Sequence, residues 1–343
     1  MESRSIKCVV WDLDNTIWDG ILLEDHNVTL KEKMVETIKE LDRRGILNAI
    51  ASRNFYEEAW EKLQQFKIAH YFVCAEISME GAKSQSVANI SKQLNLALDA
   101  FAFIDDQDFE IEEVKTGCPE VLCLKADNQL SILDKKEFIP RFVTEDSAMR
   151  RVYYQNDVKR QEYEKGFKRN VEFLQSLNMK MIIKEAEEED LKRVEELTIR
   201  THQLNSTGIT YDYNELISFI QDENYLLLVS EMEDKFGAYG KIGVTLIEKG
   251  EQSWHIKLHL MSCRVMSRGV GNAVLCNIIE YTKKNNLKLY ADFKKTSRNK
   301  NMYFAYKLLG FTEAQEKDDY VKFYFESKET PQIPAFVEIE SDL

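Results

Sequence analysis

The sequence has few of the features that disorder, secretion and membrane spanning require. Its 343 residues include only four prolines and thirteen glycines, so we expect folded structure along most of the chain. No apolar run approaches the roughly 20 residues that cross a bilayer, and the polar first seven residues lack the apolar core of a signal peptide. The six cysteines form no CxxC pair and no cluster with histidine at zinc-binding spacing. We therefore predict a cytoplasmic protein that keeps its thiols reduced and has no membrane partner.

Positive charge is also in short supply. The chain has 46 lysines and arginines against 59 aspartates and glutamates, and its formal net charge is −13. A field of this sign repels nucleic acid and anionic membrane surfaces, so we expect neither as a partner. It also opposes small phosphorylated substrates. Any phosphate site must therefore be locally positive, through a metal ion, a lysine or a helix N-terminus.

Short apolar runs alternate with amphipathic helical segments in the first part of the chain. The runs that we expect to be strands are residues 7–12, 46–51, 71–75, 101–104 and 121–124, and the helices are 30–44, 55–67 and 83–95. Strands that are apolar throughout and separated by helices indicate a parallel sheet covered on both faces. Ligands bind such sheets at the carboxyl ends of the strands, where we expect Asp12, Ser52 and Asp105 to converge.

The rest of the chain predicts a helical connector and a second α/β domain. A charged helical region is expected at 136–178, a strand at 179–184 and an acidic helix at 186–200. Three strands follow at 225–231, 241–248 and 253–263, then a glycine-led helix at 269–284, a strand at 287–292, a helix at 302–309 and a final strand. This order resembles the mixed α/β fold of GNAT acetyltransferases. We therefore predict a parallel-sheet domain at 1–135, a helical connector at 136–178, a GNAT-like domain at 179–330 and a C-terminal tail at 331–343.

The segment Asp12-Leu13-Asp14-Asn15-Thr16 predicts phosphoryl-transfer chemistry. This chemistry needs a carboxylate nucleophile and a second acid nearby; Asp12 would attack phosphorus, and Asp14 would protonate the leaving oxygen and then activate water. Nucleophile and phosphate are both anionic, so we expect Mg²⁺ between them. A turn or an N-cap cluster is the alternative for the Asp12–Thr16 segment taken alone.

The order Asp-x-Asp, Ser, Lys, Asp-Asp over residues 6–126 resembles the four motifs of the haloacid dehalogenase superfamily. We expect the metal ligands to be Asp12, Asp14, Asp105 and Asp106. The expected phosphate-binding residues are Asn15, Thr16, Ser52, Arg53 and Lys83.

The segment 253–263 alternates as a strand does and ends in a thiol. On a regular strand one face carries Trp254, Ile256, Leu258 and Leu260, and the other carries His255, Lys257, His259, Met261 and Cys263. Cys263 is a candidate nucleophile because the neighbouring Arg264 favours its thiolate; a small buried core residue is the alternative. His259 lies about 13 Å from Cys263 along an ideal strand, so it cannot act as its base unless a bulge intervenes.

A glycine-rich turn at Ser267–Asn272 opens the following helix. The backbone N–H groups of such a turn can bind the pyrophosphate of coenzyme A or the phosphate of phosphopantetheine, as acetyltransferases do. An ordinary tight turn explains the same residues equally well.

Both halves together resemble FkbH-like proteins, which join a haloacid dehalogenase domain of the IIIC type to an acyltransferase-like domain. The motifs that carry the resemblance are Asp12–Gly20, Glu24-Asp25, Ser52-Arg53-Asn54, Phe103–Asp106 with Glu110, Thr201–Thr207, Phe236-Gly237, Ser262–Val265 and Arg298-Asn299.

The resemblance implies a bifunctional glyceryltransferase/phosphatase. Such a protein removes phosphate from 1,3-bisphosphoglycerate, holds the glyceryl unit on Cys263 as a thioester, and loads it onto the phosphopantetheine of an acyl carrier protein in polyketide-type biosynthesis. The implied partners are thus a phosphorylated three-carbon acyl donor and a carrier protein. The expected acyl or pantetheine site comprises His202, Gln203, Asn205, His259, Arg264, Gly269, Gly271 and Asn299.

The chain departs from the FkbH-like pattern mainly around this acyl site, at His202, Lys257, Ser267 and Gly271, and at 107–108 beside the phosphatase site. Two other functions therefore stay open. One is a Mg²⁺-dependent phosphatase fused to a coenzyme-A-dependent GNAT acyltransferase with another substrate. The other is a non-enzymatic carrier-binding module that uses basic residues between 283 and 300.

Overall fold

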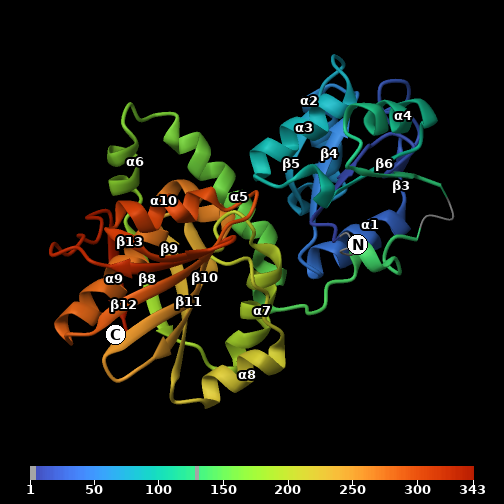
Figure 1. The fold of residues 1–343 in the computed structure, drawn as a ribbon. Coiled ribbons are helices and arrows are strands. Elements are labelled where there is room, and N and C mark those ends of the chain that lie inside the picture. The colour runs from blue at the N-terminus through green and yellow to red at the C-terminus, as the bar shows by residue number, and fades with distance from the viewer. Residues whose placement is uncertain (1–4, 128–130) are drawn as a thin grey trace. The chain divides into compact units, whose positions relative to one another are not determined.

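The computed structural model describes residues 5–127 and 131–343, which form two compact units, Met1–Val158 and Lys159–Leu343 (Figure 1). The boundary between the units falls inside helix α5 (Glu145–Glu164), in the segment where we predicted a helical connector. A short helical turn, η3 (Lys136–Phe138), precedes α5, and α6 (Asn170–Ser176) follows it. In the described part of the chain, no helix is long and apolar enough to span a bilayer.

The first unit contains the parallel sheet that the apolar runs predicted. Within residues 5–127, five strands pair in the order β5-β4-β1-β6-β7, and every neighbouring pair is parallel. The strands are β1 (Cys8–Trp11), β4 (Leu47–Ser52), β5 (Phe72–Ile77), β6 (Phe101–Asp105) and β7 (Leu122–Lys125). A small antiparallel hairpin of β2 (Trp18–Asp19) and β3 (Thr29–Leu30) follows β1.

Helices cover both faces of this sheet, which explains why its strands are apolar throughout. They are α1 (Glu32–Arg43), α2 (Tyr56–Gln65), α3 (Lys83–Leu94) and α4 (Asp108–Gly117), with the short turns η1 (Ala69–Tyr71) and η2 (Leu98–Ala100). Val9 and Trp11 of β1 pack in one apolar cluster with residues of α1 and α2. Cys8 and Val10 pack in the other with residues of α3 and α4, as the alternation of side chains along a strand requires.

The second unit contains a mixed sheet. Within residues 159–343, eight strands pair in the order β13-β14-β12-β11-β10-β9-β8-β15, with parallel pairing in β11–β12 and β8–β15. The strands are β8 (Met179–Glu185), β9 (Tyr225–Asp234), β10 (Gly237–Lys249), β11 (Ser253–Met261), β12 (Lys288–Lys294), β13 (Phe311–Lys317), β14 (Tyr320–Phe325) and β15 (Val337–Ser341).

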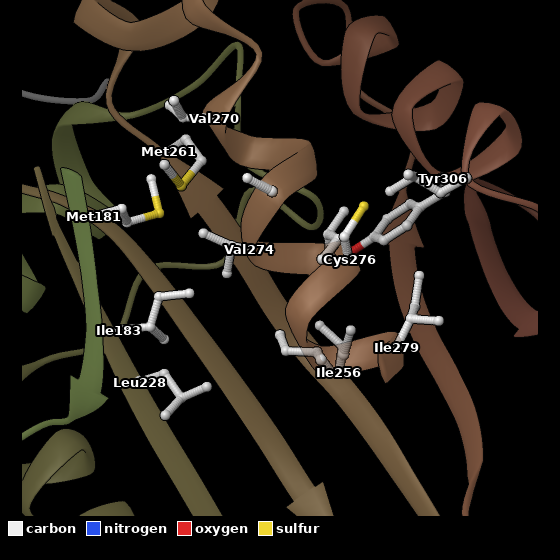
Figure 2. Close-up of a cluster of buried hydrophobic side chains, with 14 of the residues drawn as sticks. Met181, Ile183, Leu228, Ile256, Met261, Val270, Val274, Cys276, Ile279 and Tyr306 are labelled. Atoms are coloured by element: carbon white, nitrogen blue, oxygen red, sulfur yellow. The ribbon is translucent and has the colours of Figure 1, made fainter. Parts of the chain in front are cut away.

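Helices pack on both faces of the mixed sheet too. They are η4 (Glu188–Asp190), α7 (Leu191–Arg200), α8 (Tyr213–Gln221), η5 (Cys263–Arg268), α9 (Val270–Lys284) and α10 (Lys300–Leu308). Figure 2 shows the larger core, in which Val274 and Ile279 of α9 lie over Ile256 of β11. Residues of α7 and α8 pack in a separate cluster with Leu258 and Leu260 of the same strand.

Several elements of the second unit had no counterpart in our prediction: helix α8, strand β15, and one of the two strands β13 and β14, where we expected a single final strand. Helix α8 begins at a capping box in which Asp212 and Glu215 satisfy each other's backbone N–H groups, a signal that is present in the sequence. Strand β15 lies in the segment 331–343 that we expected to be a tail. It pairs in parallel with β8 and so belongs to the edge of the sheet.

A buried ion pair ties the end of α5 to the β9–β10 hairpin inside the second unit. The Arg160 guanidinium donates from Nε and from one terminal nitrogen to the two carboxylate oxygens of Asp234, both at 2.8 Å. The same side chain donates to the Gly237 carbonyl at 2.8 Å and lies 3.7 Å from the centre of the Tyr239 ring. Arg160 is therefore a structural residue of this unit.

Candidate functional site

The carboxyl edge of the parallel sheet brings together the polar residues that the sequence predicted. Asp12 follows β1 directly, Ser52 ends β4, and Asp105 ends β6. Lys83 is the first residue of α3, which follows the neighbouring strand β5. Parallel strands end at one edge, so four segments far apart in the chain place their side chains in one small volume.

Lys83 lies between two carboxylates at the centre of this site. Its Nζ is 2.7 Å from Asp12 Oδ1 and 2.5 Å from Asp105 Oδ2. All three side chains are buried, and Lys83 itself is only 4% exposed. The arrangement contains two negative charges and one positive charge, so the buried group has a net charge of −1 that a cation would compensate.

The buried charges around Asp12, the predicted nucleophile, change the pKa of its carboxyl group. Burial raises the pKa of Asp12 to about 6, although Lys83 acts in the opposite direction and Asp105 adds to the rise. A hydrogen bond from Ser52 lowers the same pKa. Burial, with the Asp105 charge second, also raises the pKa of Asp106. The site therefore disfavours three ionised carboxylates until further positive charge arrives.

The residues fit a divalent cation. Asp12, Asp105 and Asp106 can each offer an oxygen, and these oxygens lie within 4.8 Å of one another. Oδ1 of Asp106 is buried and has no hydrogen-bond partner among the described residues, which a bound cation would explain. Three clustered carboxylates are a donor set that Mg²⁺ prefers. The Asp14 carboxylate lies outside this group, so its predicted part in metal binding stays a prediction.

Asp14 is held in place by its own hydrogen bonds. Its Oδ1 accepts from the Trp18 indole at 2.8 Å and from the Leu22 backbone N–H at 3.0 Å. Its Oδ2 accepts from the Asn54 amide at 3.0 Å, and the same amide donates to Ser52 Oγ at 3.2 Å. Asn54 thus links the predicted acid to the predicted phosphate ligand, a role that our list of site residues missed although Ser52-Arg53-Asn54 stood out as a motif.

The remaining predicted phosphate ligands have different surroundings. Asn15 has a φ of +52° and accepts the Gly20 N–H at 3.1 Å, so its side chain closes the loop after β1. Thr16 is buried, and within residues 5–127 and 131–343 its hydroxyl has no hydrogen-bond partner. Arg53 is held through Nε by the buried Glu110, 2.8 Å away, while its side chain stays 44% exposed. Glu110 is a second residue that our list of site residues omitted.

Replacing Lys83 with methionine should lower the rate of phosphate release roughly 10²-fold, because the electrostatic neutralisation of the phosphate is lost. The change also leaves Asp12 and Asp105 without their shared cation, so Mg²⁺ should raise the melting temperature of the variant more than that of the unmodified protein. Thermal unfolding with and without Mg²⁺, together with a phosphate-release assay, measures both effects. Lys92→Met, on the exposed side of the same helix, is the control. A Lys83 variant with unchanged turnover would refute this role.

The second unit corrects the predicted faces of the segment 253–263. The pairing of β10 with β11 shifts at Leu246/Ile247, so Lys257 is an extra residue in the ladder. Trp254 and Ile256 therefore share a face with Met261, and Leu258 and Leu260 turn to the opposite face. The regular alternation that we predicted was wrong because a single bulge exchanges the two faces of a strand.

The bulge changes the neighbours of both histidines on this strand. His255 accompanies Lys257, and both contact the Asp292 carboxylate, at 2.7 Å and 2.9 Å. His259 instead lies beside a cavity of about 250 Å³. Gly269 and Gly271 line the same cavity, so three of the residues predicted for the acyl site meet there.

The other residues predicted for the acyl site do not line this cavity. The strand ends at Met261, and Cys263 is the first residue of η5. The side chains of Cys263 and Arg264 are both half-buried. Asn299 donates to the carbonyls of Asn205 and Lys294 at 3.0 Å and 2.9 Å. Asn205 accepts from the backbone N–H groups of Thr207 and Gly208.

The buried side-chain amides of Asn205 and Asn299 therefore stabilise the loops in which they lie. The predicted His202 and Gln203 lie exposed in the loop before them.

The comparison with known families concerns the first unit. Residues 15–117 match the haloacid dehalogenase-like hydrolase family, a range that begins just after Asp14 and contains Ser52, Lys83 and Asp105. This part of the chain is therefore a hydrolase domain of that family. No curated protein is significantly similar to the chain.

Solved structures resemble each half of the chain separately. One is the N-terminal part of BF1531 from Bacteroides fragilis, which contains a phosphatase domain and was solved with Mg; it is 25% identical over 45% of this chain and 41% of that chain, with a TM-score of 0.33. The match thus spans less than half of that protein.

Two others are N-acetyltransferases. The ribosomal-protein-S18-alanine enzyme from Escherichia coli is 16% identical over 43% of this chain and 96% of that chain, with a TM-score of 0.35. PaiA from Thermoplasma acidophilum, solved with coenzyme A, is 13% identical over 43% of this chain and 99% of that chain, with a TM-score of 0.34. The first unit thus contains a haloacid dehalogenase-like hydrolase domain built on a parallel sheet, and a mixed-sheet domain follows it.

Proposed function

We propose that the chain is a bifunctional phosphatase and acyltransferase that removes phosphate from a phosphorylated three-carbon acyl donor and passes the acyl group to a phosphopantetheine thiol. The observation that carries the phosphatase half is the buried group of Asp12, Lys83 and Asp105 with Asp106 beside it. The resemblance of both halves to FkbH-like proteins supports 1,3-bisphosphoglycerate as the donor and an acyl carrier protein as the acceptor.

In the first unit, Asp12 Oδ attacks the phosphorus of a phosphate monoester, and an aspartyl-phosphate forms as the P–O bond to the leaving alcohol breaks. Asp14, held by Trp18, Leu22 and Asn54, gives its proton to the leaving oxygen and then takes one from the water that hydrolyses the intermediate. Asp12, Asp105 and Asp106 would hold a Mg²⁺ ion, which would supply positive charge at the phosphoryl oxygens.

In the second unit, the proposed nucleophile is Cys263. Its thiolate attacks the carbonyl carbon of the acyl phosphate, and phosphate leaves with the bonding electrons. The resulting thioester is then attacked by the phosphopantetheine thiolate of the carrier, which restores the Cys263 thiolate. An acyl phosphate is already activated, so this sequence needs no ATP.

Intact-protein mass spectrometry after incubation with 1,3-bisphosphoglycerate tests the loading half. We expect a glyceryl adduct on the unmodified protein and none on Cys263→Ala, because alanine has no thiol to acylate. A panel of other phosphorylated acyl donors defines the preferred acyl group. An adduct that persists unchanged in Cys263→Ala would show that another residue holds the acyl unit.

A second candidate function has support from one observation, the cavity beside Gly269 and Gly271, whose lining does not include Cys263. This arrangement suits an acyltransferase that moves an acyl group from coenzyme A directly to its acceptor, without a cysteine intermediate. Calorimetry with acetyl-coenzyme A addresses this candidate, and the absence of any heat of binding at millimolar ligand would argue strongly against it.

A further inference from the structure

The cavity in the second unit is largely apolar but has one buried polar atom. Its volume is about 250 Å³, which is below the roughly 300–1,000 Å³ of pockets that enclose a whole small molecule. Met261, Val265, Met302 and Leu275 are among the apolar residues that line it. The space therefore suits a narrow chain rather than an entire nucleotide cofactor.

The polar atom is Nε2 of His259. The side chain is 1% exposed, and its Nδ1 lies 2.9 Å from the Thr245 hydroxyl. Among the described residues, Nε2 has no hydrogen-bond partner of normal geometry. A Cβ atom added at Gly271, another lining residue, would lie 3.9 Å from Nε2, so this atom sits at the cavity wall that the glycine leaves open. A buried polar atom without a partner requires an explanation, and a ligand in the cavity is one.

His259 is uncharged at neutral pH. Burial lowers its pKa to about 4, and the backbone of Gly271 beside the ring raises it by less. A neutral imidazole has one N–H; when the Thr245 hydroxyl donates to Nδ1, that proton is on Nε2. The ring then presents a hydrogen-bond donor to the cavity, and its complement is an acceptor oxygen on an uncharged part of the ligand.

The helix N-terminus that lines the same cavity suits an anion. Gly269, with a φ of +69°, precedes the 15-residue helix α9, whose first N–H groups have no partners within the helix. Gly269 and Asn272 line the cavity, so a ligand can reach from this helix N-terminus to His259. A phosphopantetheine arm has a phosphate at one end, a narrow amide chain, and a thiol or thioester at the other.

We propose that His259 donates a hydrogen bond from Nε2 to the thioester carbonyl of an acylated phosphopantetheine arm bound in this cavity. This inference rests on the proposed transfer to or from a phosphopantetheine thiol, and it assigns the residue that distinguishes the acylated arm from the free one. Coenzyme A and a carrier protein share this arm, and the experiment separates them.

Calorimetry on the full chain compares acetyl-coenzyme A with coenzyme A, and an acetyl-phosphopantetheinyl carrier protein with its unacylated form. One net hydrogen bond predicts that the acetylated ligand binds about fivefold more tightly. His259→Phe keeps a ring in place but removes the donor, so the preference should disappear while the affinity for the free thiol changes less than about twofold. His259→Gln can place an amide N–H near the position of Nε2 and should retain part of the preference.

The matched variant is His259→Phe with Thr245→Val, which also removes the hydroxyl that the first change leaves without its partner. It should bind both ligand forms as His259→Phe does, with higher stability. Equal weakening of both forms by His259→Phe would overturn the proposal, and so would the failure of both thioesters to bind the unmodified protein. A thioester preference in the unmodified protein that forms no glyceryl adduct with 1,3-bisphosphoglycerate would leave this inference standing and reject the loading mechanism.

Discussion

Replacing Asp12 with asparagine should reduce the rate of phosphate release by at least about 10³-fold, because an amide can neither attack phosphorus as a carboxylate does nor balance a bound cation. Lys83 keeps its contact with Asp105 in this variant, so the fold should survive. Phosphate release from a simple phosphate monoester in the presence of Mg²⁺ measures the loss. Asp99→Asn is the matched control, since this exposed aspartate precedes β6 at the opposite edge of the sheet and should leave the rate unchanged.

The same variant tests whether the two proposed activities can be separated. If Cys263 accepts the acyl group independently of the phosphatase, Asp12→Asn should still form the adduct with 1,3-bisphosphoglycerate. That adduct should then retain the phosphate of the monoester, and mass spectrometry distinguishes it from the glyceryl adduct. Residual phosphate release above about a tenth of the unmodified rate would mean that Asp12 is not the nucleophile.

The largest expected effect on stability comes from Arg160→Met. This change leaves Asp234 buried without its cation and removes the contact with the Tyr239 ring, and breaking such a pair costs about 3–5 kcal/mol. The chain has two units and need not unfold in one step, so hydrogen exchange of the backbone amides in β9 and β10 is the suitable measurement. Protection there should fall roughly 10²- to 10⁴-fold.

Two further variants separate the charge from the packing. Adding Asp234→Asn to Arg160→Met removes the unpaired charge, so part of the lost protection should return. Lys295→Met breaks a 2.5 Å ion pair with Glu316 in which both side chains are about half exposed, and such an exposed pair contributes little to stability. If Arg160→Met had no more effect than Lys295→Met, the buried pair would not be holding α5 to the hairpin.

The two units differed in how well the sequence predicted them. In the first unit, each predicted strand matches an observed one within about two residues, because apolar runs between amphipathic helices have no other way to bury both faces. The positions of Asp12, Ser52 and Asp105 follow directly, since all parallel strands end at one edge. Lys83 joins them as the first residue of a helix that begins at the same edge.

In the second unit, the sequence predicted the order of the elements better than the positions of the side chains. One extra residue at Lys257 exchanged the faces of β11, so His259 turned toward α9 while His255 stayed with Asp292 on the other side. A bulge depends on how the neighbouring strand pairs, and alternation within one strand cannot reveal it. Strand β15 was not predicted because it also depends on pairing with another strand: its partner β8 lies more than 150 residues away in the chain.

The sequence by itself determined the parallel sheet, the acidic motif at its carboxyl edge and the mixed α/β character of the second half, because these follow from local periodicity and from the chemistry of Asp12 and Asp14. Only the tertiary structure decided that Lys83 bridges Asp12 and Asp105, that Asn54 links Ser52 to Asp14, and that His259 faces a cavity. These contacts join segments from different strands and helices, and their geometry depends on sheet register and helix packing, which no single stretch of sequence specifies.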